Sequence, residues 1–327
     1  MAKKVILDVD TGSDDAVAIM TALLSDDIDL LGVTVTHGNQ PLPITLENTL
    51  RVMSYMNGKT PVFKGCYTPL VKWLTPGRDL PGGEVGRSTV TVNGKTYSLH
   101  EENMGLSPTN LKEQDIPAAI WIVDTIKNSP EKITVIPVGP CSNIALALRI
   151  DPTIVENIEE IIIMGGADNM GNRTGAGEFN FFADPEAAKI VVNCGAKITI
   201  IPLNATHSAK FDYNDAARFD ALGTKAGKFT GKLIRHRADF ERVQGQGDGD
   251  TAVHDALTVC TLIDRSIVTE SCEQIVDIDI GGSIADGMMY CDTRPVSKDI
   301  PKNATVAYKI DKEKVLNLML RIMSRDL

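Results

Sequence analysis

Short apolar segments alternate with longer amphipathic segments along this chain, and this alternation restricts the possible folds more than any other feature of the sequence. Most of the early short segments are β-branched and unbroken, as expected for strands buried on both faces of a parallel sheet. They span residues 4–9, 29–36, 133–138, 159–164, 197–203, 274–280 and 304–310. The segments that predict helices span residues 14–24, 43–56, 116–127, 143–149, 185–192, 253–263 and 312–323. The sequence therefore predicts an α/β fold with a doubly wound, mostly parallel sheet flanked by helices.

Residues 88–99 interrupt this alternation, because two segments rich in Thr, Val and Tyr flank the dipeptide Asn93-Gly94. Asn-Gly favours a type I′ turn between antiparallel strands. We therefore expect a hairpin insertion on the surface of a single domain that spans residues 1–327. The sequence contains no internal repeat, low-complexity segment or Pro/Ser-rich linker that would divide it.

The charge balance argues against several classes of partner. The chain carries 43 acidic and 33 basic residues and a formal charge of −10, whereas nucleic acids and anionic membranes attract basic patches. Only three apolar residues follow Lys3 and Lys4 before Asp8, too few for a signal peptide, and no apolar run approaches the roughly 20 residues of a membrane helix. We therefore expect a cytoplasmic protein without nucleic-acid or membrane partners, whose six cysteines are free thiols.

Four aspartates, Asp8, Asp10, Asp14 and Asp15, lie close together after the first predicted strand. Helix capping accounts for Asp14 and Asp15, but not for Asp10 at the carboxyl end of a buried strand. Ligands of open α/β sheets bind at that edge, and converging carboxylates repel each other unless protons or a cation intervene. Oxygen ligands favour Ca²⁺ or Mg²⁺, and the spacing does not match an EF-hand. An aspartyl phosphatase with Asp8 or Asp10 as nucleophile is an alternative, which Gly12 disfavours.

Other polar segments follow predicted strands and are expected at the same edge. Asn39 lies in a turn after the second strand, where it is either a turn residue or a ligand for a hydroxyl group. Glu178 and Asn180 follow a glycine-rich loop, and their spacing lets them face one way. His254 and Asp255 begin an apolar helix after another glycine-rich segment, where they suit a proton donor and a metal ligand.

With these segments in this order, the sequence resembles the inosine–uridine preferring nucleoside hydrolase family. The family signature Asp-x-Asp-Pro-Gly-x-Asp-Asp-Ala matches residues 8–16, with Thr11 in place of Pro. Further matching segments occur in the family order and span nearly the whole chain: Gly38-Asn39, Val138-Gly139-Pro140, Met164-Gly165-Gly166, Glu178-Phe179-Asn180, Asp184-Pro185-Glu186-Ala187-Ala188 and Val253-His254-Asp255.

The resemblance implies calcium-dependent hydrolysis of the N-glycosidic bond of ribonucleosides to free base and ribose. Asp10 would be the general base on a metal-bound water, and His254 would assist the leaving base. The implied calcium ligands are Asp10, Asp15, Asp255 and the backbone oxygen of Val138. The implied substrate-binding residues are Asp14, Asn39, Met164, Asn172, Glu178, Asn180 and His254. The resemblance also implies a small-molecule nucleoside as partner and assembly into a homodimer or homotetramer.

The base pocket departs from the family pattern. Some members place tyrosines on the helix before the histidine, whereas residues 235–243 of this chain contain none. His236, Arg237, Phe240 or Arg242 would meet the base instead, and Phe240 is suited to stacking. The sequence therefore does not predict the preferred base. A ribosyl-ligand binding protein without turnover is a second alternative to the hydrolase.

Overall fold

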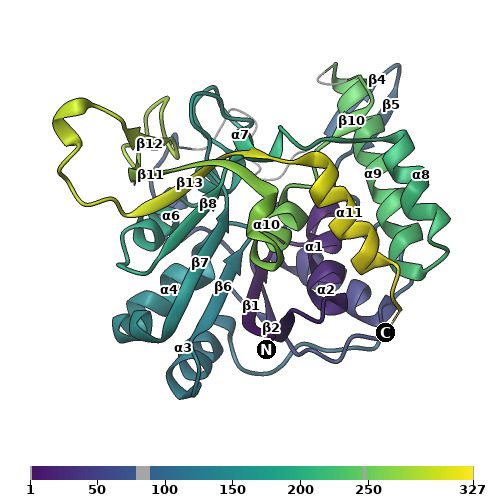
Figure 1. The fold of residues 1–327 in the computed structure, drawn as a ribbon, viewed down its shortest axis with the longest axis horizontal. Coiled ribbons are helices and arrows are strands. Elements are labelled where there is room, and N and C mark those ends of the chain that lie inside the picture. The colour runs from purple at the N-terminus through teal and green to yellow at the C-terminus, as the bar shows by residue number, and fades with distance from the viewer. Residues whose placement is uncertain (1, 79–88, 246–247, 327) are drawn as a thin grey trace.

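A nine-stranded sheet forms the centre of the computed structural model, which describes residues 2–78, 89–245 and 248–326 (Figure 1). The strand order is β12-β11-β13-β8-β7-β6-β1-β2-β3. The strands from β13 to β3 run parallel, and β11 is antiparallel to β12 and β13. Their bounds are β1 (Lys3–Val9), β2 (Ile28–Val35), β3 (Val62–Lys64), β6 (Ile133–Pro137), β7 (Ile158–Met164), β8 (Ile198–Ile201), β11 (Val268–Ile278), β12 (Met289–Asp292) and β13 (Ala304–Ile310). The predicted mostly parallel α/β fold is confirmed.

Helices cover both faces of the sheet, and each face has its own hydrophobic core. In β1, Leu7 and Val9 belong to one core and Ile6 to the other, because successive side chains of a strand point to opposite faces. On the first face lie α1 (Ser13–Leu24), α2 (Leu42–Tyr55), α8 (Tyr213–Ala221), α9 (Lys225–Gln244), α10 (His254–Ile263) and α11 (Lys312–Met323). On the second face lie α3 (Ala118–Asn128), α4 (Ser142–Ile150) and α6 (Pro185–Val192).

The chain changes direction across the sheet at β1, which lies between β2 and β6. From β1 it continues outward to β2 and β3, and it later returns to place β6 on the other side of β1. The loops that leave the carboxyl ends of β1 and β6 therefore diverge and open a crevice. Asp10 follows β1 and Val138 follows β6, so both lie at this switch point.

The predicted hairpin is present as β4 (Thr89–Val92) and β5 (Lys95–Ser98). Asn93 and Gly94 both have positive φ, as a type I′ turn requires. Residue 88, the first of the predicted insertion, lies outside the described residues. The remaining short elements are η1 (Lys72–Leu74), η2 (Pro152–Asn157), α5 (Phe179–Ala183), α7 (Leu203–Thr206), β9 (Phe211–Asp212), β10 (Asp250–Thr251), η3 (Arg265–Ile267) and η4 (Pro295–Ser297).

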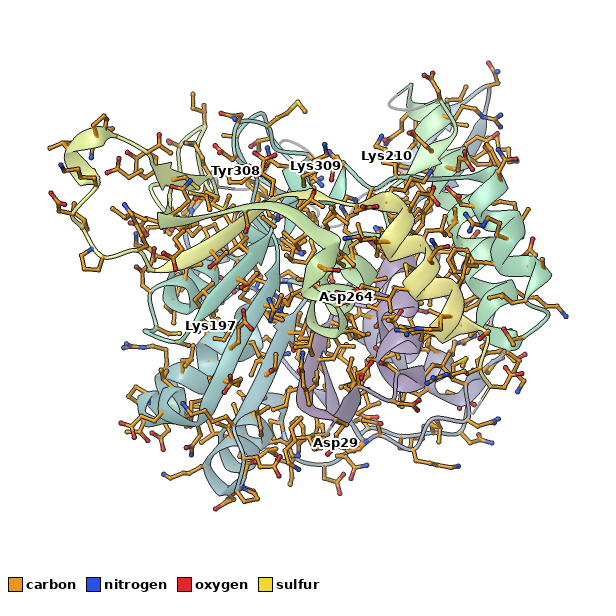
Figure 2. All side chains as sticks on the ribbon, in the orientation of Figure 1. Asp29, Lys197, Lys210, Asp264, Tyr308 and Lys309 are labelled. Atoms are coloured by element: carbon orange, nitrogen blue, oxygen red, sulfur yellow. The ribbon has the colours of Figure 1, made fainter. Side chains whose placement is uncertain are left out.

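In Figure 2, labelled charged residues lie at both ends of the strands, the amino ends and the carboxyl ends. Asp29 and Lys197 lie near the amino ends of β2 and β8, whereas Lys210 lies toward the opposite side of the sheet, where the strands end. The six cysteines are free, as predicted. Among the described residues, no helix combines the length and the apolar character that a membrane crossing requires.

Candidate active site

A cavity of about 390 Å³ opens at the carboxyl edge of the sheet. Its floor lies at the crevice between β1 and β6, and α9 and α10 contribute to its walls. Many of the predicted metal and substrate residues line it: Asp14, Asn39, Val138, Met164, Asn172, Glu178, Asn180, His254 and Asp255. Residues that are far apart in the sequence therefore come together at one edge of the sheet, as the strand pattern predicts.

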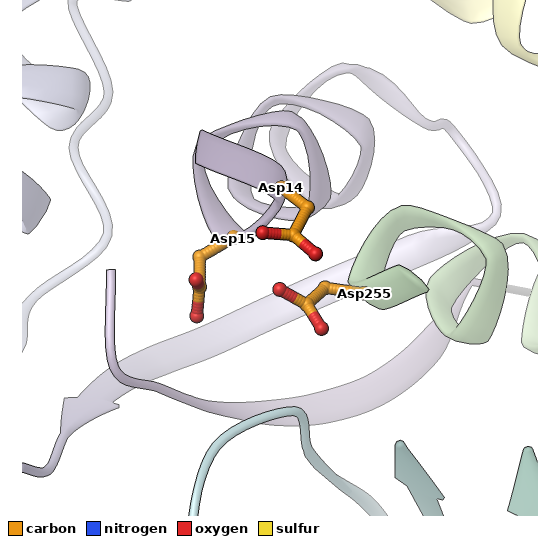
Figure 3. Close-up of side chains that lie close together, drawn as sticks. All are labelled: Asp14, Asp15 and Asp255. Atoms are coloured by element: carbon orange, nitrogen blue, oxygen red, sulfur yellow. The ribbon is translucent and has the colours of Figure 1, made fainter. Parts of the chain in front are cut away.

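Three buried carboxylates converge beside this cavity (Figure 3). Asp14 and Asp15 come from the first turn of α1, and Asp255 comes from the first turn of α10. One carboxylate oxygen from each lies within 4.8 Å of the others. Both helix N-termini favour negative charge, but the dipoles do not remove the mutual repulsion of three buried anions. The arrangement is therefore suited to a cation.

Asp10 and Asp15 are not among the residues that line the cavity, and Asp10 is hydrogen-bonded to Asp15 and Asn39. The Asp10 N–H donates to Asp15 Oδ1 at 3.0 Å, and the Asn39 N–H donates to Asp10 Oδ2 at 2.6 Å. The other oxygen, Asp10 Oδ1, is buried without a hydrogen-bond partner among the described residues. A Cβ atom at position 139, which is Gly, would lie only 2.6 Å from this oxygen. The glycine thus keeps space beside an unsatisfied carboxylate oxygen.

Burial raises the pKa of each of these carboxyl groups. The pKa of Asp15 is raised to about 6, by burial first and then by the charge of Asp14. Burial and the charges of Asp14, Asp15 and Asp10 raise the pKa of Asp255 well above its ordinary value. The positive charge of Arg237 acts in the opposite direction on Asp14 and Asp255. Since Arg237 pairs with Asp14 and offsets only part of this negative charge, the set of oxygen donors fits a hard divalent cation such as Ca²⁺ or Mg²⁺.

Glu178 and Asn180, at the start of α5, form hydrogen bonds that hold the cavity wall opposite the acidic cluster. The Glu178 carboxylate accepts hydrogen bonds from the backbone N–H groups of Gly166, Asn180 and Phe181, at 2.9, 3.0 and 3.1 Å. Burial raises the pKa of Glu178 to about 7. Asn180 Nδ2 donates to the backbone oxygen of Val138 at 2.8 Å. Hydrogen bonds within the protein hold this wall, and it presents one carboxylate and one amide to the cavity.

Met164 and Asn172 complete this wall. Asn180 Nδ2 also donates to the backbone oxygen of Met164 at 3.0 Å. Asn172 Oδ1 accepts a hydrogen bond from the Phe179 N–H at 2.9 Å, which leaves its amide nitrogen for a ligand.

Three histidines line the cavity, and only one of them is among the predicted site residues. His254 Nδ1 is paired with Thr206 Oγ1 at 2.8 Å, and its ring packs edge-to-face on His207 at 5.5 Å between centroids. His100 Nδ1 accepts a hydrogen bond from the Ser13 N–H at 3.2 Å. Nothing in the sequence around His207 marks it as a site residue.

The α9 wall corrects part of the base-pocket prediction. Arg237 and Phe240 line the cavity, but His236 and Arg242 do not. His236 Nε2 is paired with the Ser98 backbone oxygen at 2.8 Å, and exposed Arg242 donates to Asp239 Oδ1 at 3.1 Å. The physical reason is helical register. The lining positions of α9, which are 237, 240, 241 and 244, share one face that excludes 236 and 242.

The side chains of Asp8 and His37 form hydrogen bonds with residues that do not line the cavity. Asp8 Oδ1 accepts hydrogen bonds from Thr34 Oγ1 at 2.5 Å and from Asn143 Nδ2 at 2.7 Å. His37 Nε2 is paired with Ser142 Oγ at 3.1 Å, and burial lowers the pKa of His37 to about 4. Both side chains therefore connect neighbouring elements beneath the site.

Comparisons with known proteins agree with this geometry. A family model described as inosine-uridine preferring nucleoside hydrolase matches residues 5–317. Pyrimidine-specific ribonucleoside hydrolase RihB of Escherichia coli (strain SE11) is 34% identical over 311 residues, which cover 94% of this chain and 93% of RihB. The purine-preferring ribonucleoside hydrolase from Gardnerella vaginalis has a TM-score of 0.84 at 29% identity and covers 98% of both chains. The plant nucleoside hydrolase PpNRh1 has a TM-score of 0.84 at 27% identity and covers 99% of both chains.

Proposed function

Because the chain belongs to the inosine–uridine preferring nucleoside hydrolase family, we propose that it hydrolyses ribonucleosides to free base and ribose with a bound calcium ion and Asp10 as general base. The observation that carries this proposal is the buried Oδ1 atom of Asp10, which has no hydrogen-bond partner among the described residues. It lies next to Asp15 and close to the other acidic side chains of the cluster. A buried carboxylate oxygen of this kind needs a ligand or a proton.

Asp10, Asp15, Asp255 and the backbone oxygen of Val138 would hold the calcium ion. The Val138 oxygen already accepts a hydrogen bond from Asn180 Nδ2, but a carbonyl oxygen has a second lone pair. When bound, the cation offsets the charge of the carboxylates and makes a nearby water molecule more acidic. The all-oxygen donor set supports calcium over zinc, which prefers nitrogen and sulfur ligands.

Asp10 would accept the proton of the attacking water. The Asn39 N–H holds Oδ2 at 2.6 Å, which fixes the carboxylate and leaves Oδ1 for the water. The reacting sugar gains positive charge as the N-glycosidic bond breaks, and the nearby carboxylates of Asp14 and Glu178 stabilise that charge. Because the nucleophile is water, we expect inversion at the anomeric carbon, by analogy with inverting glycosidases.

Asp14 and Asn39 would bind the ribose hydroxyl groups from one side, and Glu178, Asn180 and Asn172 from the other. One oxygen of Asp14 is bound by Arg237 at 2.8 Å, so its second oxygen remains for the sugar. Two walls whose side chains are already hydrogen-bonded within the protein would hold the ribose for attack in line with the leaving base. With Nδ1 of His254 engaged by Thr206, Nε2 is the nitrogen that remains to assist that base.

The proposal predicts strong selectivity for ribose over 2′-deoxyribose. Removal of the 2′-hydroxyl would leave the second oxygen of buried Asp14, the one that Arg237 does not bind, without this partner. A hydrogen bond to a charged group contributes about 1.5–3 kcal/mol. We therefore expect kcat/KM for uridine to exceed that for 2′-deoxyuridine by about 10-fold to 10²-fold. The measurement is reducing-sugar release from both nucleosides at equal calcium concentration.

Asp14→Asn provides the control for this comparison. If Asp14 binds the 2′-hydroxyl, the variant should lose activity mainly toward uridine, so the ratio between the two substrates should fall toward one. Equal rates of the wild type on both substrates would show that the ribose hydroxyls do not bind where we propose.

A further inference from the structure

Arg237 is a buried cation in the wall of the cavity. Its side chain projects from the middle of α9, and only 3% of the residue is exposed. Its Nη1 atom donates to Ser13 Oγ at 2.9 Å and to Asp14 Oδ1 at 2.8 Å. Its Nε atom is buried without a hydrogen-bond partner among the described residues. A guanidinium group offers five N–H donors, so the two contacts of Nη1 leave donors that a ligand can use.

The residues next to Arg237 on the same helix face favour a flat, uncharged ring as its ligand. Phe240 follows one turn later and Gln244 two turns later, and both line the cavity. Phe240 is 3% exposed and supplies an aromatic surface, and Gln244 supplies an amide. The carboxylate of this face, Glu241, accepts a hydrogen bond from Thr251 and pairs with Lys210 at 3.8 Å. This wall therefore differs from the side that would hold the sugar and the metal, where several carboxylates converge.

Breakage of the N-glycosidic bond leaves its electron pair on a ring nitrogen of the base. The water oxygen bonds to the anomeric carbon, one water proton passes to Asp10, and the base departs with the electron pair as an anion that later takes up a proton from solvent. In uracil or hypoxanthine the charge spreads to ring carbonyl oxygens, which accept hydrogen bonds well. A fixed guanidinium in a buried site stabilises such charge as it develops.

We propose that Arg237 contacts the base of the bound nucleoside and stabilises the negative charge that builds on it as the glycosidic bond breaks. This inference rests on the proposed function and adds a catalytic residue to it. Lys210 does not meet the same need, because Glu241 and Asp250 already share its charge at 3.8 and 3.5 Å.

The competing explanation is that Arg237 acts only through Asp14, as a positioning residue for the ribose. The substrate 4-nitrophenyl β-D-ribofuranoside distinguishes the two roles of Arg237. It carries the same sugar as a ribonucleoside, but its nitrophenolate leaving group is stable as an anion and needs no stabilisation by the protein. Arg237→Met should lower kcat/KM for uridine and inosine by about 10²–10³-fold, and that for the nitrophenyl riboside by less than about fivefold. Guanidinium ion added to Arg237→Ala should restore part of the rate on uridine only.

Arg235→Gln is the matched control, because Arg235 lies on the same helix and pairs with Asp220 at 2.6 Å, away from the cavity. If Arg237→Met does not fold, Arg237→Lys replaces it in the experiment, because lysine keeps the charge but lacks the planar guanidinium group. This variant should lose activity on uridine selectively. Equal losses on uridine and the nitrophenyl riboside, with calcium content unchanged, would overturn the role in leaving-group stabilisation. Inactivity of the wild type on all these ribosides would instead overturn the function on which it rests.

Discussion

Replacement of Asp10 by Asn is expected to lower kcat for ribonucleoside hydrolysis by about 10³-fold or more, within the range that a general base contributes. The Asn side chain keeps the shape of Asp10 and can still accept the Asn39 N–H that now donates at 2.6 Å. What it loses is the ability to take a proton at Oδ1, the buried oxygen that has no hydrogen-bond partner among the described residues. Steady-state rates with saturating uridine and inosine measure the effect.

Asp8→Asn is the matched control for this experiment. Asp8 is a buried carboxyl group on β1, shortly before Asp10, and its Oδ1 atom accepts hydrogen bonds from Thr34 and Asn143. Burial already raises its pKa to about 7, so a neutral amide is expected to be tolerated there. The calcium content of both variants must equal that of the wild type. If Asp10→Asn with bound calcium kept the wild-type rate, Asp10 would not be the general base.

Removal of the metal is expected to have the second large effect. Four acidic side chains, Asp10, Asp14, Asp15 and Asp255, lie buried around one site with Arg237 as their opposing charge. Without a cation these carboxylates repel each other, and the attacking water loses its activation. Dialysis against a chelator should therefore lower kcat by at least about 10³-fold and also lower Tm, and added calcium should restore both. Full activity of a protein shown to contain no metal would contradict this account.

The effect of calcium should depend on pH in a defined direction. The pKa of Asp15 in the metal-free protein is raised to about 6 from an ordinary value of 3.8. A group whose pKa is raised by folding stabilises the fold when protonated, and this stabilisation is lost as the pH rises through the raised pKa. The metal-free protein should therefore lose stability between about pH 4 and about pH 7, while calcium affinity rises by about tenfold per pH unit for each displaced proton. Calorimetric titration with calcium at several pH values measures this.

The central sheet could be predicted from the sequence because its strands are buried on both faces. The predicted segment 133–138 corresponds to Ile133–Pro137, and 304–310 to Ala304–Ile310. The antiparallel strands β11 and β12 at one edge of the sheet could be predicted only in part. Only residues 274–280 were predicted there, whereas the strand begins at Val268, in a part whose side chains are mostly exposed. Strand direction depends on pairing with distant segments, which a single sequence does not reveal.

The acidic residues and the residues proposed to bind ribose could be located because they follow strand ends in recognisable motifs. The base side could not be resolved in the same way. Which of His236 and Arg237 faces the cavity depends on how α9 packs, and neighbouring helix positions point about 100° apart. His207 follows the short helix α7 and reaches the cavity only because β8 ends at the same sheet edge.

Product analysis with the wild-type protein tests the central claim most directly. The calcium-loaded protein is incubated with uridine, cytidine, inosine, adenosine or guanosine, and free base and reducing sugar are quantified by chromatography. The account predicts equal amounts of base and ribose from at least one of them in the absence of phosphate, with Asp10→Asn inactive beside it. Release that requires phosphate, or no release from any of the five while calcium is bound, would contradict a nucleoside hydrolase in which Asp10 activates water.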